Sequence, residues 1–236
     1  MADNTAHTVK SFDEDIAQLR TIISRMGGLC EVQIGAAVDA LVTRNVDAAR
    51  QVVEDDKRID ALEAEAEALA VRIIALRAPL AGDLREIVAA MKIAGVLERI
   101  GDYAKNIAKR ASALAQAPPI EPVIIVPEMA RAVIAMIKDV LDAFVDRDAV
   151  LARAVTERDR RVDDFYNSLF RSLLTFMMEN PQYITPSTHL LFVAKNLERI
   201  GDHATSVGEM VHFAVTGDHI VDRPKTDDTS TFANRT

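Results

Sequence analysis

The chain has 236 residues, of which 49% are hydrophobic and 27% charged, so it can build a core and is not an intrinsically disordered protein. Aromatic residues make up 5% and Trp is absent, which favours helices over sheets. The formal net charge of −8 and the lack of a basic block argue against nucleic-acid binding and favour cations or basic protein surfaces as partners.

The first predicted helix covers residues 12–43. Ser11 and Glu14 form a capping-box pair at its start, and apolar residues then recur at helical spacing. The pair Gly27-Gly28 interrupts this pattern and weakens the prediction of a straight helix.

Two further helices complete the first half of the chain. One is expected over residues 47–76, and the next follows the turn at Pro79 and continues to about residue 115. Four prolines then fall within positions 118–127, which a helix interior does not tolerate. We therefore interpret residues 117–127 as a linker.

The helical pattern restarts after the linker. Helices are expected over residues 127–145 and 148–178, and then from residue 185 or 187 to about 215. Asn180-Pro181 reads as the turn between the last two helices. Residues from about 217 onward are polar and turn-rich, which is typical of a mobile tail.

A nearly identical sequence occurs in both halves. The segment LERIGD at 97–102 reappears unchanged at 197–202, and DKRID at 56–60 matches DRRVD at 159–163. A repeat of about 100 residues predicts that one structural unit is duplicated.

The repeat sets the expected fold class. We expect an all-α protein of two antiparallel three-helix bundles that pack together. The first bundle covers residues 11–116, the proline-rich linker 117–127, the second bundle 128–216 and the flexible tail 217–236.

Each half also carries two carboxylate pairs at a spacing of i, i+4, which places both members on one helix face. Like charges at this spacing destabilise a helix, so we expect cations to offset them. The pairs are Asp56/Asp60 and Glu98/Asp102 in the first half, and Asp159/Asp163 and Glu198/Asp202 in the second.

The two pairs of each half are predicted to meet. When two helices are joined by a short turn, residues equally far from the turn lie at one level. The first-half pairs centre on positions 58 and 100, each 21 residues from Pro79, and the second-half pairs are centred about Asn180-Pro181 in the same way. Helical wheels place Asp56/Asp60 at the border of the apolar stripe and Glu198/Asp202 further round, short of the opposite face. Four carboxylates should therefore converge on one patch in each half.

Such a patch is a candidate metal site. Its oxygen-only donors suit a divalent or trivalent hard ion, with Mg²⁺, Mn²⁺ or Fe favoured over Ca²⁺ and Zn²⁺. His203 points to a different side of the helix from Asp202 and is not expected to be a first ligand. In the simpler alternative the pairs face water beside arginine partners, for which the candidates are Arg58, Arg99, Arg161 and Arg199.

The longer repeated blocks resemble those of the PhoU family over residues 11–216. They are PLAGDLREIVAAMKIAGVLERIGDYAKNIA and HLLFVAKNLERIGDHAT. The resemblance implies two three-helix bundles related by a pseudo-two-fold axis, in a cytoplasmic accessory protein of the high-affinity phosphate transport system. Such proteins restrain the phosphate-starvation response and are thought to link the transporter ATPase PstB to the sensor kinase PhoR.

The resemblance also implies metal binding at E/D-x-x-x-D motifs, which here are the four carboxylate pairs. The family often has Asn four residues after the motif Asp. Asn106 keeps this feature and Ser206 replaces it, so we expect the second site to be weaker or differently occupied.

The leading functional hypothesis is a non-enzymatic signalling adaptor, because the sequence offers no nucleophile–base constellation and no nucleotide-binding glycine loop. A homodimer is expected, although the sequence leaves the oligomeric state open. Two alternatives remain. A helical carboxylate metalloenzyme would need two Glu-x-x-His pairs, of which only Glu209/His212 occurs, and a metal-free scaffold would bind nothing at the acidic patches.

Location follows from the cysteine and hydropathy patterns. Cys30 is the only cysteine, which excludes an intramolecular disulfide and fits a reducing compartment. No uninterrupted apolar run reaches the length of about 18 residues that a membrane span needs, and residues 1–10 lack a signal peptide's apolar core. We expect a cytosolic protein that can still dock on a membrane protein from inside.

Overall fold

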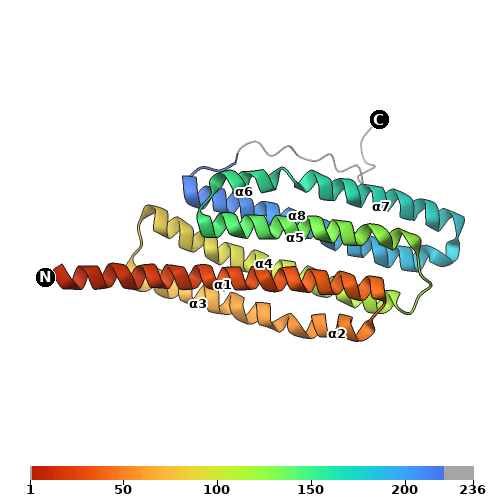
Figure 1. The fold of residues 1–236 in the computed structure, drawn as a ribbon, viewed down its shortest axis with the longest axis horizontal. Helices are drawn as coiled ribbons and strands as arrows, with labels where there is room; N and C mark the ends of the chain where they lie inside the picture. Colours follow the sequence, from red (N-terminus) through yellow and green to blue (C-terminus); the bar gives the residue numbers. More distant parts are fainter. Residues whose placement is uncertain (1, 221–236) are drawn as a thin grey trace.

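The computed structural model describes residues 2–220, and the described side chains begin at Ser11 (Figure 1). All regular structure in this range is helical, which confirms the all-α prediction. Most of the predicted tail, residues 221–236, lies outside the described residues.

The first half contains four helices. They are α1 (Ala2–Thr43), α2 (Val46–Asp55), α3 (Lys57–Arg77) and α4 (Ala81–Leu114). The turn predicted at Pro79 lies between α3 and α4, as expected. The second predicted helix is in fact two segments, because the chain breaks at Asp56.

The second half repeats this order. It contains the 3₁₀ helix η1 (Glu121–Ile125), α5 (Val126–Asp146), α6 (Ala149–Thr156), α7 (Asp159–Glu179), the 3₁₀ helix η2 (Pro181–Tyr183) and α8 (Ile184–Thr216). The long predicted helix is again split, here between α6 and α7. The turn predicted at Asn180-Pro181 is present between α7 and α8.

Helix α1 differs from its prediction in two ways. It begins at Ala2, so Ser11 lies inside the helix and the predicted start at the capping box is wrong. A capping pattern is a local signal, and a helix that continues on both sides overrides it. The helix also runs through Gly27 and Gly28 without a break.

The glycines of α1 have a packing explanation. A methyl group at Gly27 would lie 1.9 Å from Leu141 Cδ1 on α5, whereas one at Gly28 would meet nothing within 4 Å. Gly27 therefore lets α1 approach α5 across the boundary between the halves.

The apolar content of α1 also corrects the expectation from hydropathy. Within Ser11–Thr43 the helix is long and apolar enough to cross a membrane, by length and composition alone. Half of its most apolar window is buried inside the protein, and the helix packs on α3, α4 and α5. A core helix satisfies the same test, so its apolar face is accounted for by the bundle.

The two halves are arranged around a pseudo-two-fold axis. Helices α1 and α4 pack against α5 and α8 at the centre, while α3 and α7 lie on opposite outer sides (Figure 1). Helices α4 and α8 run antiparallel. At their crossing Tyr103 stacks on His203, the equivalent residue of the other repeat, with ring centroids 5.4 Å apart.

A buried carboxylate also connects the halves. Glu86 on α4 is 8% exposed and lies between two arginines. Arg20 Nε on α1 donates to its Oε1 at 2.7 Å, and Arg147 Nη1, in the turn after α5, lies 3.2 Å from its Oε2. A buried charge of this kind is tolerated because it is paired and hydrogen-bonded.

We predict opposite effects for alanine at the two adjacent glycines of α1. Gly28→Ala should raise the free energy of unfolding by about 1 kcal/mol through helix propensity, because its Cβ meets no neighbour. Gly27→Ala should be less stable than Gly28→Ala by about 1–3 kcal/mol, because Leu141 must be displaced within the core. Urea unfolding followed by circular dichroism measures both, and equal stabilities would contradict the close α1–α5 contact.

Candidate functional site: two acidic patches beside α4 and α8

The acidic pair of α3 lies at a helix start and not in a helix interior. Asp56 occupies the break between α2 and α3, where Ile59 N donates to Asp56 O at 2.8 Å in a tightened turn. Asp56 is only 2% exposed, whereas Asp60, in the first turn of α3, is exposed. The helix N-terminus carries a partial positive charge, which favours carboxylates at this position.

The two pairs of the first half meet at the predicted level. Asp56 Oδ1 would lie 3.3 Å from a methyl group at Gly101, the glycine of the repeated LERIGD segment on α4. The ammonium of Lys105 lies 2.6 Å from Asp56 Oδ2 and 3.1 Å from Asp102 Oδ1. Asp56 and Asp102 thus face one cation supplied by the chain. We call Asp56, Asp60, Glu98 and Asp102 the first acidic patch.

The remaining carboxylates of this patch affect each other's ionisation. Burial raises the pKa of Glu98, and the neighbouring charge of Asp102 raises it further. Burial also raises the pKa of Asp60, as does Asp56, while Lys105 opposes this effect. The patch therefore favours a cation, and Lys105 supplies one.

The second half repeats the geometry with a different cation. Asp159 begins α7 directly after the break, is 6% exposed, and its Oδ1 would lie 3.0 Å from a methyl group at Gly201. Lys195 Nζ donates to Glu198 Oε1 at 2.8 Å. The position equivalent to Lys105 is Thr205.

Burial dominates the ionisation of Glu198 in this half. It raises the pKa of Glu198, Lys195 opposes the shift, and the nearby charges of Asp202 and Asp163 add to it. Glu198, Asp202 and Asp163 therefore lie close enough to interact. Asp159 on α7 lies beside Gly201 on α8, next to Asp202 in the chain. We call Asp159, Asp163, Glu198 and Asp202 the second acidic patch.

Neither patch is a preformed metal site. Within residues 11–220, no three Asp, Glu, His or Cys side chains form a group able to hold an ion. The first patch fits a metal poorly, because the Lys105 ammonium already bridges Asp56 and Asp102. The second fits one better, because the uncharged Thr205 replaces Lys105 and because Glu198 Oε2 is a buried oxygen without a hydrogen-bond partner in the described structure.

Three polar residues near the motifs have other roles. His203 Nε2 lies 3.3 Å from the Tyr103 hydroxyl, and burial, with Arg99, lowers the pKa of His203. Ser206 Oγ donates to the main-chain oxygen of Asp202 at 3.0 Å. Asn106, its counterpart, lines a pocket between α4 and α8.

Sequence reasoning missed the cation of the first patch. It named arginines as partners, yet Lys105 makes both ion pairs, and Arg199 lies instead over the ring of Tyr103 at 5.9 Å. Lys105 follows Asp102 by three residues, a spacing that places the two side chains on one helix face. That spacing was the available signal.

Comparisons with known proteins give a consistent family. The PhoU domain matches residues 23–111 and 126–211. A protein of Zymomonas mobilis is 54% identical over 224 residues, which are 95% of this chain and 94% of that protein, and one of Caulobacter vibrioides is 49% identical over 225 residues, which are 94% and 98%. Both are named phosphate-specific transport system accessory protein PhoU homologs.

Solved structures agree with this result. The crystal structure of PhoU from Pseudomonas aeruginosa superposes with a TM-score of 0.83 at 38% identity, covering 88% of this chain and all of that one. The phosphate transport system regulatory protein PhoU from Streptococcus pneumoniae gives 0.82 at 25% identity, covering 89% and 99%.

We predict that Lys105→Ala lowers the free energy of unfolding by about 2 kcal/mol, because the buried Asp56 carboxylate loses its ion pair. Urea unfolding in the presence of a chelator measures the effect without contribution from metals.

Two variants serve as controls for this prediction. Lys57→Ala removes an exposed lysine next to Asp56 and should change stability by less than about 0.5 kcal/mol. The double variant Lys105→Ala/Asp56→Asn should regain at least half of the loss, because no buried charge is left alone. A Lys105→Ala protein as stable as the wild type would refute the ion-pair account.

Proposed function

The chain belongs to the PhoU family, and on that premise we propose that it is a negative regulator of the phosphate-starvation response and a modulator of high-affinity phosphate uptake. In this proposal it works in the cytoplasm as a non-catalytic adaptor between the transporter ATPase PstB and the sensor kinase PhoR. The observation that carries the proposal is the near full-length similarity to proteins named as accessories of phosphate-specific transport.

The surface of the bundle supports an adaptor. The α3–α4 turn exposes Leu76 and Leu80, which are 72% and 80% exposed, and the α7–α8 turn exposes Met178 and Ile184, at 85% and 49%. These turns lie at opposite ends of the molecule (Figure 1). Clustered exposed apolar side chains mark interaction surfaces, and two ends suit a protein that joins two partners. A homodimer remains the proposed assembly, which light scattering tests.

The metalloenzyme alternative has less support. His212, of the Glu-x-x-His pair, lies with its Nδ1 3.1 Å from the main-chain oxygen of Asp218 and 3.4 Å from Thr216 Oγ1. These contacts engage its ring at the end of α8, away from the LERIGD segment that carries Glu198 and Asp202.

We also propose that a hard cation, with Mg²⁺, Mn²⁺ or Fe as candidates, binds the second acidic patch in preference to the first. The buried Glu198 Oε2 supports this order, because a cation would satisfy this oxygen, and no lysine occupies the position equivalent to Lys105. In the first patch a metal would have to displace Lys105. This order reverses the expectation that Ser206 weakens the second site.

Deleting the gene should raise alkaline phosphatase expression in phosphate-rich medium, because the restraint on the starvation response is lost. A plasmid copy of the wild type should restore low expression, whereas Leu80→Ser and Met178→Ser, each altering one exposed end, should restore it only in part. Unchanged expression in the deletion strain would refute the regulatory role.

Measuring the metal content of two variants distinguishes metal binding at the first acidic patch from binding at the second. After incubation with Mn²⁺ and desalting, elemental analysis should find metal in the wild type and a clear loss in Glu198→Gln. The matched variant Glu98→Gln, at the equivalent position of the first repeat, should keep the wild-type content. Equal losses in both variants, or no metal in the wild type, would contradict the preference for the second patch.

A further inference from the structure

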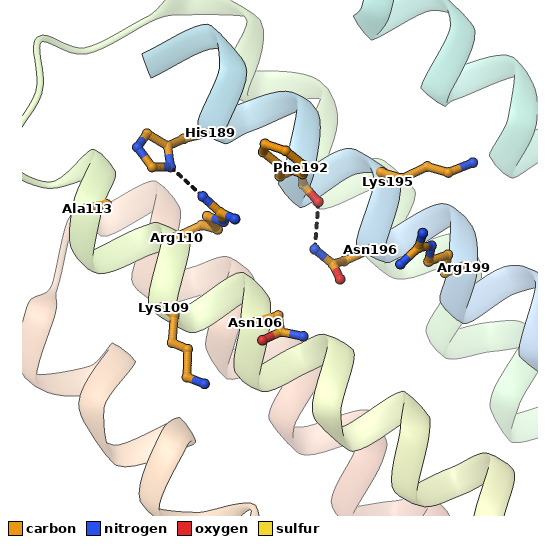
Figure 2. A pocket seen from close by; sticks show the side chains of 9 residues that line it. All are labelled: Asn106, Lys109, Arg110, Ala113, His189, Phe192, Lys195, Asn196 and Arg199. Atoms are coloured by element: carbon orange, nitrogen blue, oxygen red, sulfur yellow. Dashed lines mark hydrogen bonds between the residues drawn. The ribbon is translucent and has the colours of Figure 1, made fainter. Parts of the chain in front are cut away.

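A basic pocket of about 440 Å³ lies between α4 and α8 (Figure 2). Its α4 residues follow Tyr103 in the chain, so it lies on the side of the Tyr103–His203 contact towards the C-terminal end of α4. It is the pocket mentioned above that contains Asn106. The side chains used in the following argument are Lys109 and Arg110 from α4, and His189, Phe192, Lys195 and Arg199 from α8. We call this site the basic pocket.

The pocket is positively charged in a chain with a net charge of −8. None of the nine described residues that line it is Asp or Glu. Lys109, Arg110 and Arg199 contribute cations, while Lys195 shares its charge with Glu198 through the 2.8 Å hydrogen bond. A concave site lined by one sign of charge concentrates counter-ions of the opposite sign.

Arg110 is held in place by uncharged groups. Its Nη1 lies 3.1 Å from His189 Nδ1, which accepts as a neutral imidazole, and its guanidinium stacks over the Phe192 ring at 4.5 Å (Figure 2). Neither contact neutralises the guanidinium. An arginine fixed in orientation with its charge uncompensated is suited to bidentate binding of an oxyanion.

The duplication provides an internal comparison. A counterpart pocket of about 410 Å³ lies on the other side of the Tyr103–His203 contact, also between α4 and α8. There the positions equivalent to Lys109, Arg110 and His189 are Glu209, Met210 and Ala89. The counterpart pocket has cations of its own, Arg85 and Lys92, but at other positions and together with the acidic Glu209. The same backbone arrangement therefore forms with a different set of side chains. Packing of α4 on α8 therefore does not require Lys109, Arg110 and His189 at their positions, which leaves them available for recognition of an anion.

The geometry points to a ligand of defined chemistry, and we propose that the basic pocket binds a small molecule carrying two or more phosphate groups. Arg110 from α4 and Arg199 from α8 line the same cavity, whereas the ammonium groups of Lys109 and Lys195 point away from its centre (Figure 2). Two phosphate groups can therefore each meet a guanidinium. The amide of Asn106 lines the same cavity and offers a further donor, while Asn196 Nδ2 already donates to the main-chain oxygen of Phe192 at 2.6 Å. The volume falls within the range of small-molecule sites. The proposal rests on these side chains and stands independently of the regulatory role.

Pyrophosphate is the test probe. Isothermal titration of the full chain at low salt should show saturable binding below millimolar concentration, with inorganic phosphate binding at least about tenfold more weakly. Arg110→Met should weaken pyrophosphate binding about tenfold, because one bidentate cation is lost. Met is the residue at the equivalent position of the counterpart pocket, so the variant is expected to fold, which circular dichroism checks.

Two further variants and a spectroscopic measurement complete the test of the proposal. Lys109→Glu/Arg110→Met, which copies two residues of the counterpart pocket, should abolish binding, while Lys92→Ala in the counterpart pocket should leave it unchanged. In NMR spectra of the wild type, pyrophosphate should shift the side-chain amide signals of Asn106 and Asn196. The proposal is overturned by the absence of saturable binding, by affinities that Arg110→Met does not change, or by equal affinities for phosphate and pyrophosphate.

Discussion

The packing of α4 against α8 is the interaction on which the other features of this fold depend. These helices carry the repeated LERIGD segments, run antiparallel and cross where Tyr103 stacks on His203. One face of each helix meets the other helix, and a second face meets the outer helix of its own half. The acidic patches lie on the second faces, and the pockets lie between the two helices.

The outer helices α3 and α7 pack closely on α4 and α8, and each of these two interfaces contains a buried carboxylate. Gly101 and Gly201 leave room for Asp56 and Asp159, which are almost fully buried at the starts of α3 and α7. Burying an ionised carboxylate is costly unless a partner offsets it. The positive end of the helix contributes in both halves. In the first half Lys105 also pairs with Asp56, whereas the equivalent residue of the second half is the uncharged Thr205. The duplicated backbone has thus kept its geometry while the charges on it have diverged.

Much of this architecture follows from local sequence signals, and the remainder depends on contacts that such signals do not encode. The turns near Pro79 and Asn180-Pro181 were predictable because proline punctuates helices, and their positions fixed the level at which the acidic pairs meet. The break at Asp56 could not be predicted from the sequence, because its backbone stays in the right-handed helical region and neither Gly nor Pro marks it. The basic pocket was missed for another reason, since Arg110 and His189 are 79 positions apart and become neighbours only when the halves pack.

Hydrogen exchange tests the central claim, that α4 and α8 join the two halves into one cooperative unit. The account predicts that the amides around Ile100 and Ile200, both fully buried, are among the slowest to exchange and open with the same free energy, equal to that of global unfolding. Exchange in which one of these segments opens at a much lower free energy, while the other stays protected, would show that the halves unfold separately and would contradict the account.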